Sequence, residues 1–190
     1  MSKRRLAGRK KRATASCPAS FVFRTTLGWA GVTGTAQGVN AIVLAKPSRR
    51  AAERALGRQA VQGESSLSRV VRQALRNAQT QIAAYLAGRR RTLDFPVDLS
   101  GGTSFQRKVW QAALRIPYGR ARSYRWIASK VGGKQYARAV GSALGANPVL
   151  LIVPCHRVVA HDASLGGFAC GLAVKRKLLE LEGTLKQLKM

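Results

Sequence analysis

The chain has 190 residues, of which 46% are hydrophobic, so it can form one large or two small folded units and is not disordered overall. It carries 34 Lys and Arg against 7 Asp and Glu, a net charge of +27 at pH 7. Such an excess attracts polyanions, which makes nucleic acid the first candidate partner, ahead of a ribosome-like structural role or an anionic membrane surface.

Cysteine and histidine usage limits the chemistry further. Cys17, Cys155 and Cys170 form no C-x-x-C motif, so we expect a reducing, intracellular setting, either cytoplasm or nucleoid. The only histidines are His156 and His161, too few for a structural zinc site, and no metal is expected. No apolar run approaches about 18 residues, and no signal-peptide core is present, so neither membrane insertion nor export is predicted.

The first part of the chain predicts a small α/β unit. Residues 1–20 form a basic tail that is either a solvated arm or a non-specific DNA tether. Residues 21–26 and 39–45 are apolar and rich in β-branched residues, and glycines punctuate the stretch between them. This pattern predicts two strands joined by a glycine-rich connection, in a hairpin or meander. Residues 48–63 are expected to be irregular or to form a short helix.

One long helix and a linker follow. Apolar residues recur at helical spacing across 67–86 and predict an amphipathic helix that ends near Gly88. Residues 89–102 combine a charge cluster with Pro, Ser and glycines, which is typical of a linker. We therefore expect a tail over 1–20, an N-terminal α/β domain with its linker over 21–99, and a C-terminal domain over 100–190.

The C-terminal part predicts short helices in a helix-turn-helix arrangement. Thr103 and Gln106 form a capping-box pattern at the start of one helix. Ser123 can cap a second helix, and Gly132 and Gly133 make a turn into a third. Two short helices joined by a glycine turn are typical of helix-turn-helix DNA-binding proteins.

The charge pattern supports a DNA-binding surface. No acidic residue occurs between Asp98 and Asp162. Arg138 lies off the apolar stripe of the third helix, beside the small residues Gly141 and Ser142, so it could insert into a groove, or it could be one more solvated cation. The cations of this acid-free span are Arg107, Lys108, Arg115, Arg120, Arg122, Arg125, Lys130, Lys134, Arg138 and Arg157.

A buried cysteine is predicted at the end of an apolar run. Residues 149–153 are apolar and rich in β-branched residues, and Pro154 stops them, which indicates a buried strand or strand-like segment with Cys155 at its end. His156 can activate a thiol, but neighbouring residues of an extended chain point to opposite sides, so it needs a bend or a bridging water. The alternative is a small buried Cys beside a satisfied His.

The final stretch places an acid among leucines. If residues 172–188 form one helix, Glu182 lies in the middle of its apolar face, where an unpartnered carboxylate is costly. Its partner is either His156 or Lys175. With His156 as partner, we expect protonated imidazole to be favoured and Cys155 to be thiolate-rich at neutral pH.

Taken together, these strings resemble the methylated-DNA–protein-cysteine methyltransferases, the alkylguanine-DNA alkyltransferases of direct repair. The resemblance covers about the last ninety residues strongly and the first half weakly. It implies an α+β fold with a small N-terminal α/β domain of short sheet and helix, followed by a helical winged-helix or helix-turn-helix domain. The motifs that carry it are Phe105-Gln106-x-x-Val109-Trp110, Ile116-Pro117-Tyr118-Gly119, Ser123-Tyr124, Arg138-Ala139-Val140-Gly141, Asn147-Pro148, Pro154-Cys155-His156-Arg157-Val158 and Lys175-x-x-Leu178-Leu179-x-x-Glu182.

The resemblance implies a suicidal transfer without a cofactor. A monomer would bind double-stranded DNA through the minor groove, flip the alkylated base, and move the alkyl group of O6-alkylguanine, and of O4-alkylthymine, to Cys155. His156 would act as base through a water and be oriented by Glu182, Tyr124 would press on the target phosphate, and Asn147 would brace the turn before Cys155. The implied DNA-binding residues are Ser123, Tyr124, Arg125, Ala137, Arg138 and Gly141. The implied base pocket consists of Leu144, Val158, Phe168 and Ala169.

The sequence also departs from the family pattern near the pocket. Ala163 replaces a frequent Gly, Phe168 a common Tyr, and Cys170 a common Gly at the expected pocket wall, which bears on the alkyl groups that fit. Two other functions stay open. One is a non-reactive alkylated-base DNA-binding protein, although such relatives lack the Cys. The other is a general nucleic-acid-binding protein without alkyl transfer.

Overall fold

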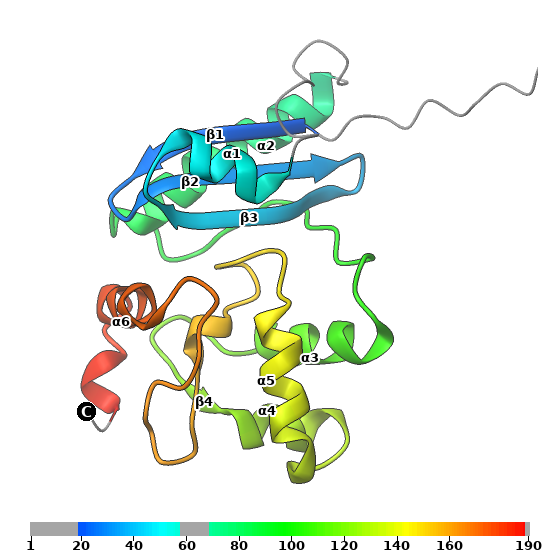
Figure 1. Cartoon of the computed structure of the whole chain (residues 1–190), viewed down its shortest axis with the longest axis vertical. Coiled ribbons are helices and arrows are strands. Elements are labelled where there is room, and N and C mark those ends of the chain that lie inside the picture. The colour runs from blue at the N-terminus through cyan, green and yellow to red at the C-terminus, as the bar shows by residue number, and fades with distance from the viewer. Residues whose placement is uncertain (1–18, 58–68, 189–190) are drawn as a thin grey trace, which may run out of the picture.

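A computed structural model describes residues 19–57 and 69–188 (Figure 1). The predicted basic tail therefore lies almost wholly outside the described residues, as do the last residues of the predicted 48–63 segment. None of the described helices is both long enough and apolar enough to cross a membrane.

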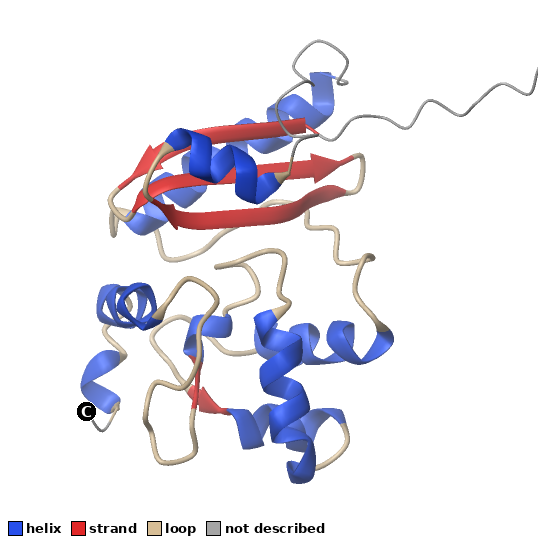
Figure 2. Ribbon diagram, viewed as in Figure 1, coloured by secondary structure: helices blue, strands red, loops and turns tan. Residues whose placement is uncertain are grey.

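The N-terminal unit is a three-stranded antiparallel sheet with a helix on each face (Figure 2). Its elements are β1 (Ala19–Thr25), β2 (Gly28–Thr35), β3 (Gly38–Lys46), α1 (Arg49–Leu56) and α2 (Arg69–Leu86). The glycine-rich stretch between the two predicted strands was expected to be a connection, and this prediction was wrong. The stretch forms the central strand β2. Its glycines make room for the helices: a Cβ on Gly31 would lie 2.5 Å from a methyl of Leu56 on α1, and one on Gly34 would lie 2.9 Å from Leu75 on α2.

The C-terminal unit is mainly helical, as predicted. Its elements are α3 (Ser104–Leu114), β4 (Arg122–Ser123), α4 (Tyr124–Val131), η2 (Lys134–Tyr136), α5 (Ala137–Gly145), η3 (Cys155–Arg157), β5 (Val158–Val159), α6 (Leu172–Leu181) and η4 (Leu185–Gln187). Both bonds of the predicted Thr103 capping box are present, and Ser123 caps α4 by accepting from Trp126 N. Gly132 and Gly133 form the turn between α4 and the short η2 that leads into α5. This confirms the helix-turn-helix prediction.

The apolar run before Cys155 is not a strand, contrary to the prediction. Val149 makes an isolated bridge with Ile42, Leu150 makes one with Val153, and Leu151 adopts a positive φ of 72°. The segment turns back on itself, so a continuous strand is replaced by a tight loop that is buried at most positions. High apolarity predicted its burial correctly, but short apolar runs do not distinguish a strand from a packed loop.

The last helix is also shorter than predicted. Helix α6 ends at Leu181, Glu182 forms its C-cap, and Gly183 follows with a positive φ of 71°. A glycine in this left-handed conformation is a common way to end a helix. Glu182 is therefore held at the end of α6. It does not lie in the middle of the apolar face of a longer helix, as predicted.

The two units share one core. A single cluster of buried residues runs from the sheet through α2 to the helices of the C-terminal unit. Backbone bonds join them directly: Ile42 N donates to Pro148 O at 2.7 Å, and Val39 N donates to Pro96 O at 2.9 Å. The loop that leads to Cys155 is thus fixed against β3 on one side and the helix-turn-helix on the other (Figure 1).

Candidate functional site

A largely apolar cavity of about 500 Å³ opens beside the helix-turn-helix, and Cys155 forms part of its wall. The start of α4, the exposed side of α5 and the loop before α6 enclose it. The lining residues are Tyr124, Ala137, Gly141, Leu144, Gly145, Cys155, Gly167, Phe168 and Ala169. A concave, mostly apolar cavity with a single thiol in its wall is typical of a site that binds a small ligand.

Three of the four residues of the predicted base pocket line this cavity, and two of the residues expected near it lie elsewhere. Leu144, Phe168 and Ala169 line it, whereas Val158 is fully buried in β5 outside its lining. Cys170, expected at the pocket wall, instead lines a separate groove against β3 with residues such as Leu44. Cys170 therefore belongs to the contact between the two units and is not among the residues that line the cavity.

Asn147 holds the Cys155 loop from within. Its Nδ2 donates to Val153 O at 2.9 Å and to Cys155 Sγ at 3.2 Å, while its Oδ1 accepts from Val149 N at 3.0 Å. All three contacts lie inside the loop, and the amide is buried. One side chain thus closes the turn and directs a hydrogen bond at the sulfur, as expected for a brace.

The thiol of Cys155 is not thiolate-rich in this state. Burial raises its pKa to about 11, although the Asn147 hydrogen bond and the charge of Lys175 act in the opposite direction. The expectation of a low pKa was wrong because removal from water disfavours the charged form more strongly than these partners favour it. Cys155 is therefore a neutral thiol at pH 7 and needs a base when it reacts.

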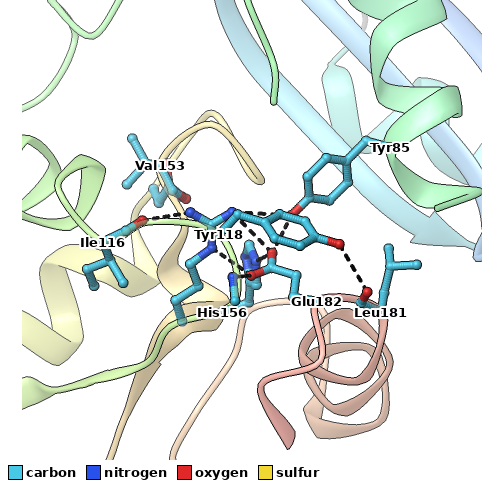
Figure 3. Close-up of polar contacts among 10 residues, drawn as sticks. Tyr85, Ile116, Tyr118, Val153, His156, Leu181 and Glu182 are labelled. Carbon is cyan, nitrogen blue, oxygen red and sulfur yellow. Dashed lines mark hydrogen bonds and ion pairs between the residues drawn. The ribbon is translucent and has the colours of Figure 1, made fainter. Parts of the chain in front are cut away.

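Glu182 is the centre of a buried polar network (Figure 3). Its Oε1 accepts from His156 Nε2 at 2.6 Å and from the Tyr85 hydroxyl, and its Oε2 accepts from Arg157 Nε at 2.8 Å and from Gly119 N at 3.3 Å. Burial raises the pKa of Glu182, but the hydrogen bonds from His156 and Arg157 and the charge of Arg157 outweigh it and lower the pKa to about 2. The predicted partner His156 is confirmed.

This network selects one form of the imidazole. A carboxylate only accepts hydrogen bonds, so His156 Nε2 must carry the proton that faces Glu182. Nδ1 is then the unprotonated nitrogen, and it is buried with no hydrogen-bond partner in the described parts of the chain. Burial lowers the pKa of His156, so the ring is neutral at pH 7, opposite to the expected imidazolium. A neutral ring with a free lone pair is a competent base.

Lys175 is not the partner of Glu182. The ammonium is buried and donates to the backbone carbonyls of Val158, Leu165 and Gly167, the last at 3.2 Å. Two of these carbonyls belong to the loop that reaches the cavity. Lys175 therefore fixes that loop. Ala163 within the loop has a positive φ of 67°, a conformation in which a glycine would be less strained.

Three of the predicted DNA-facing residues line the cavity, and the other three lie on the same helices or at their ends. Arg138 is exposed on α5 and Arg125 is exposed on α4, whereas Ser123 is half-buried as the α4 cap. Tyr124 covers one side of the cavity and its hydroxyl donates to Gly167 O at 3.3 Å. Ala137 and Gly141 line the cavity itself. The small side chains on α5 leave the cavity open next to the exposed Arg138.

The sequence pattern predicted the wrong environment for Arg157 and gave no indication of the role of Tyr85. Arg157 was counted among the surface cations but is 8% exposed, and its guanidinium bonds Glu182 and, at 2.7 Å, Ile116 O. In the sequence, Arg157 directly follows His156 and lies next to apolar residues, and this position was the available indication that it is buried. Tyr85 was assigned only to the apolar face of its helix. No spacing in the sequence indicates that this hydroxyl meets Glu182, 97 residues away. Among the described residues, no group of three or more His, Cys, Asp and Glu could hold a metal ion.

Comparisons with known proteins agree on one family. A family model described as the DNA-binding domain of 6-O-methylguanine DNA methyltransferase matches residues 104–184. The methylated-DNA–protein-cysteine methyltransferase of Mycobacterium tuberculosis is 50% identical over 109 residues, 57% of this chain and 66% of that protein. The aligned region thus spans slightly under two thirds of that relative. The Methanosarcina acetivorans methyltransferase is 45% identical over 109 residues, 57% of this chain and 69% of its own length.

Solved structures extend the similarity beyond the C-terminal unit. A crystal structure of the M. tuberculosis O6-methylguanine methyltransferase superposes with a TM-score of 0.70 at 34% identity, covering 88% of this chain and 92% of that one. A crystal structure of the M. tuberculosis protein in complex with DNA gives a TM-score of 0.68 at 33% identity, covering 88% and 94%. Both units of the chain therefore have counterparts in these structures.

Proposed function

Because the chain belongs to the methylated-DNA–protein-cysteine methyltransferase family, we propose that it repairs O6-alkylguanine in double-stranded DNA by moving the alkyl group to Cys155. The observation that carries the proposal is the position of Cys155 on a cavity of about 500 Å³, with a His156–Glu182 pair directly behind it. We also propose O4-alkylthymine as a substrate, a monomer as the working form, and a reactive C-terminal domain over residues 100–190.

The chemistry is a displacement at the alkyl carbon. Cys155 Sγ forms the new S–C bond while the C–O6 bond breaks, and the electron pair leaves with the guanine. The thiol proton passes to His156 Nδ1 through a water molecule, since that nitrogen has no direct bond to Cys155 or to any other described residue. Return of the proton to the guanine balances the charge. Glu182 holds His156 in the required tautomer and stabilises the imidazolium while it exists.

The reaction ends after one event. A thioether has no carbonyl that water can attack, so the alkylated Cys155 is not regenerated. Because its pKa is raised to about 11, the resting thiol of Cys155 is neutral and reacts poorly with other electrophiles. It reacts when an alkylated nucleobase is presented beside His156.

The helix-turn-helix delivers the base. Exposed Arg138 on α5 is suited to fill the gap left in the base stack, while Tyr124 on α4 borders both the cavity and the approach of the backbone. Flipping is required because the reacting oxygen is inaccessible inside a duplex. The acid-free span between Asp98 and Asp162 supplies the phosphate-binding charge.

The test is intact-mass measurement after incubation with a duplex that carries one 6-O-methylguanine. We expect a gain of one methyl group per molecule, located on Cys155 by peptide mapping and lost in Cys155→Ser. Binding of the lesion without a mass gain would favour the alkylated-base-binding alternative. Equal binding to damaged and undamaged DNA without a mass gain would favour a general nucleic-acid-binding protein. Label on Cys170, or repeated turnover, would also reject the proposal.

The role of Arg138 needs a test of its own. Arg138→Ala should reduce reaction with duplex DNA far more than reaction with a free modified guanine base. Arg125→Ala is the matched control, because it removes the same charge from the neighbouring helix α4. We expect it to weaken duplex binding in a salt-dependent way without the additional loss of rate at saturating DNA. If the two variants lose duplex reactivity equally, Arg138 contributes charge alone.

A further inference from the structure

The phenol of Tyr85 belongs to the N-terminal unit but bonds the network behind Cys155. It lies on α2, is 1% exposed, and directs its hydroxyl at Glu182 Oε1, the oxygen that also accepts from His156 Nε2 (Figure 3). Thus a residue far outside the helix-turn-helix shares an acceptor atom with the proposed base.

The direction of the hydroxyl proton follows from its neighbours. Arg157 Nη2 donates to Tyr85 Oη at 3.3 Å, which occupies the accepting side of the phenol. A hydroxyl has a single proton, and here it can only be directed to the carboxylate. Burial and the Glu182 charge raise the pKa of Tyr85, so the phenol stays protonated and remains a donor.

We infer that Tyr85 is a positioning residue for alkyl transfer: from the N-terminal unit, its hydroxyl holds Glu182 Oε1 against His156 Nε2 and so keeps Nδ1 available as the base. This inference rests on the proposed function. Without the hydroxyl, Oε1 keeps only His156 and the 3.2 Å contact with Arg157 Nη2, whereas Oε2 keeps Arg157 Nε and Gly119 N. The carboxylate then loses one of the contacts that fix its orientation, and the negative charge that the phenol no longer offsets acts more strongly on the imidazole.

The alternative is that Tyr85 only packs. Its ring lies edge-on to Tyr118, with centroids 5.9 Å apart and planes at 83°. Tyr118 offers a matched control, because its hydroxyl donates to the backbone carbonyl of Leu181 at 3.0 Å and makes no hydrogen bond to the carboxylate. Tyr85→Phe and Tyr118→Phe therefore each remove one hydroxyl from the same aromatic pair and keep both rings.

The first readout is the single-turnover rate as a function of pH. Glu182, Arg157 and Lys175 are the charged groups that act on His156, and none of them is altered by either substitution. Loss of a donor from Glu182 makes the carboxylate more basic, which raises the pKa of His156. Tyr85→Phe should slow transfer near neutrality by about tenfold. Its rate should also begin to fall at a higher pH as the solution is acidified, whereas Tyr118→Phe should keep the wild-type profile.

The second readout is independent of activity. The chain has only two histidines, so nitrogen NMR of the protein made without a histidine tag resolves both rings. We expect wild-type His156 to carry its proton on Nε2, and Tyr85→Phe to shift its ring signals and raise its pKa. The signals of exposed His161 should not change between variants.

The outcomes separate the two proposals. If the wild-type protein transfers no alkyl group, the proposed function fails, and the NMR comparison still reports whether Tyr85 controls His156. If the wild type transfers and Tyr85→Phe matches it in rate, pH profile and His156 signals, the positioning role is wrong, even if that variant melts at a lower temperature. The positioning role would also be overturned if Tyr118→Phe showed the same altered pH profile as Tyr85→Phe, because a change in the packing of the aromatic pair would then explain both variants.

Discussion

Replacement of Glu182 by Gln tests the network more severely than its small change in shape suggests. The carboxylate accepts from donors on both oxygens: His156 and Tyr85 on one, Arg157 and Gly119 on the other. A glutamine amide must place an NH₂ group at one of these positions. In either orientation the NH₂ group of the glutamine meets hydrogen-bond donors. When the NH₂ group faces His156, it also favours the tautomer in which Nδ1 is protonated and is no longer a base.

The size of the effect on stability follows from the pKa of Glu182, which is lowered from 4.5 to about 2 in the folded chain. That shift corresponds to about 3 kcal/mol of stabilisation by the ionised form. In a chain of 190 residues, the loss of this stabilisation in Glu182→Gln should lower Tm by roughly 6–12 °C. Because the folded pKa lies below the unfolded one, the stabilisation is complete above pH 4.5 and is lost as the pH falls toward 2. The Gln variant should lack this pH dependence.

The assay measures single-turnover transfer from a duplex containing 6-O-methylguanine, duplex affinity and Tm on the same preparation. We expect Glu182→Gln to slow transfer by at least about tenfold, or roughly 1.4 kcal/mol, with nearly unchanged DNA affinity. Glu180→Gln is the control, since that carboxylate is exposed on the same helix and should keep both rate and Tm. A folded, destabilised Glu182→Gln protein that reacts at the wild-type rate would refute the catalytic assignment.

Three further substitutions test other parts of the site and fold. Asn147→Ala removes the hydrogen bond to the sulfur and the brace of its loop, so single-turnover transfer to Cys155 should slow by about tenfold while duplex affinity is kept. Cys170→Ser changes a groove outside the cavity, so the mass gain and rate should match the wild type, and a loss of either would place the thiol in the site. Gly38→Ala puts a Cβ 2.5 Å from the Pro96 backbone at a φ of 141°, and chemical denaturation should show a loss of at least about 2 kcal/mol.

Local signals in the sequence predicted much of the C-terminal unit. Capping residues, glycine turns and apolar spacing act over a few positions, so Thr103, Ser123 and Gly132 mark their helix ends correctly. The pairing of Glu182 with His156 was also predictable, since few acids are available and burial demands a partner. The expected strand before Cys155 failed because apolar composition reports burial but does not report the path of the backbone.

Long-range electrostatics could not be predicted in the same way. The protonation states of Cys155 and His156 depend on how deeply both are buried, and partner identity alone gave the wrong direction for each. Arg157 was misassigned because a cation in a basic chain is usually solvated, and only the fold brings it to Glu182. The glycines of β2 were misread for a similar reason, since a strand crossed closely by two helices uses residues that otherwise signal turns.

The backbone bond from Ile42 to Pro148 has a consequence for how the molecule tolerates change over evolution. One edge of the sheet is fitted to the loop before Cys155, so the N-terminal unit cannot be exchanged freely for an unrelated one. Substitutions on its outer surface leave this seam untouched and can accumulate independently. Substitutions at this contact change the packing of both units at once, because the two units share one core, although only one of them contains the reactive thiol.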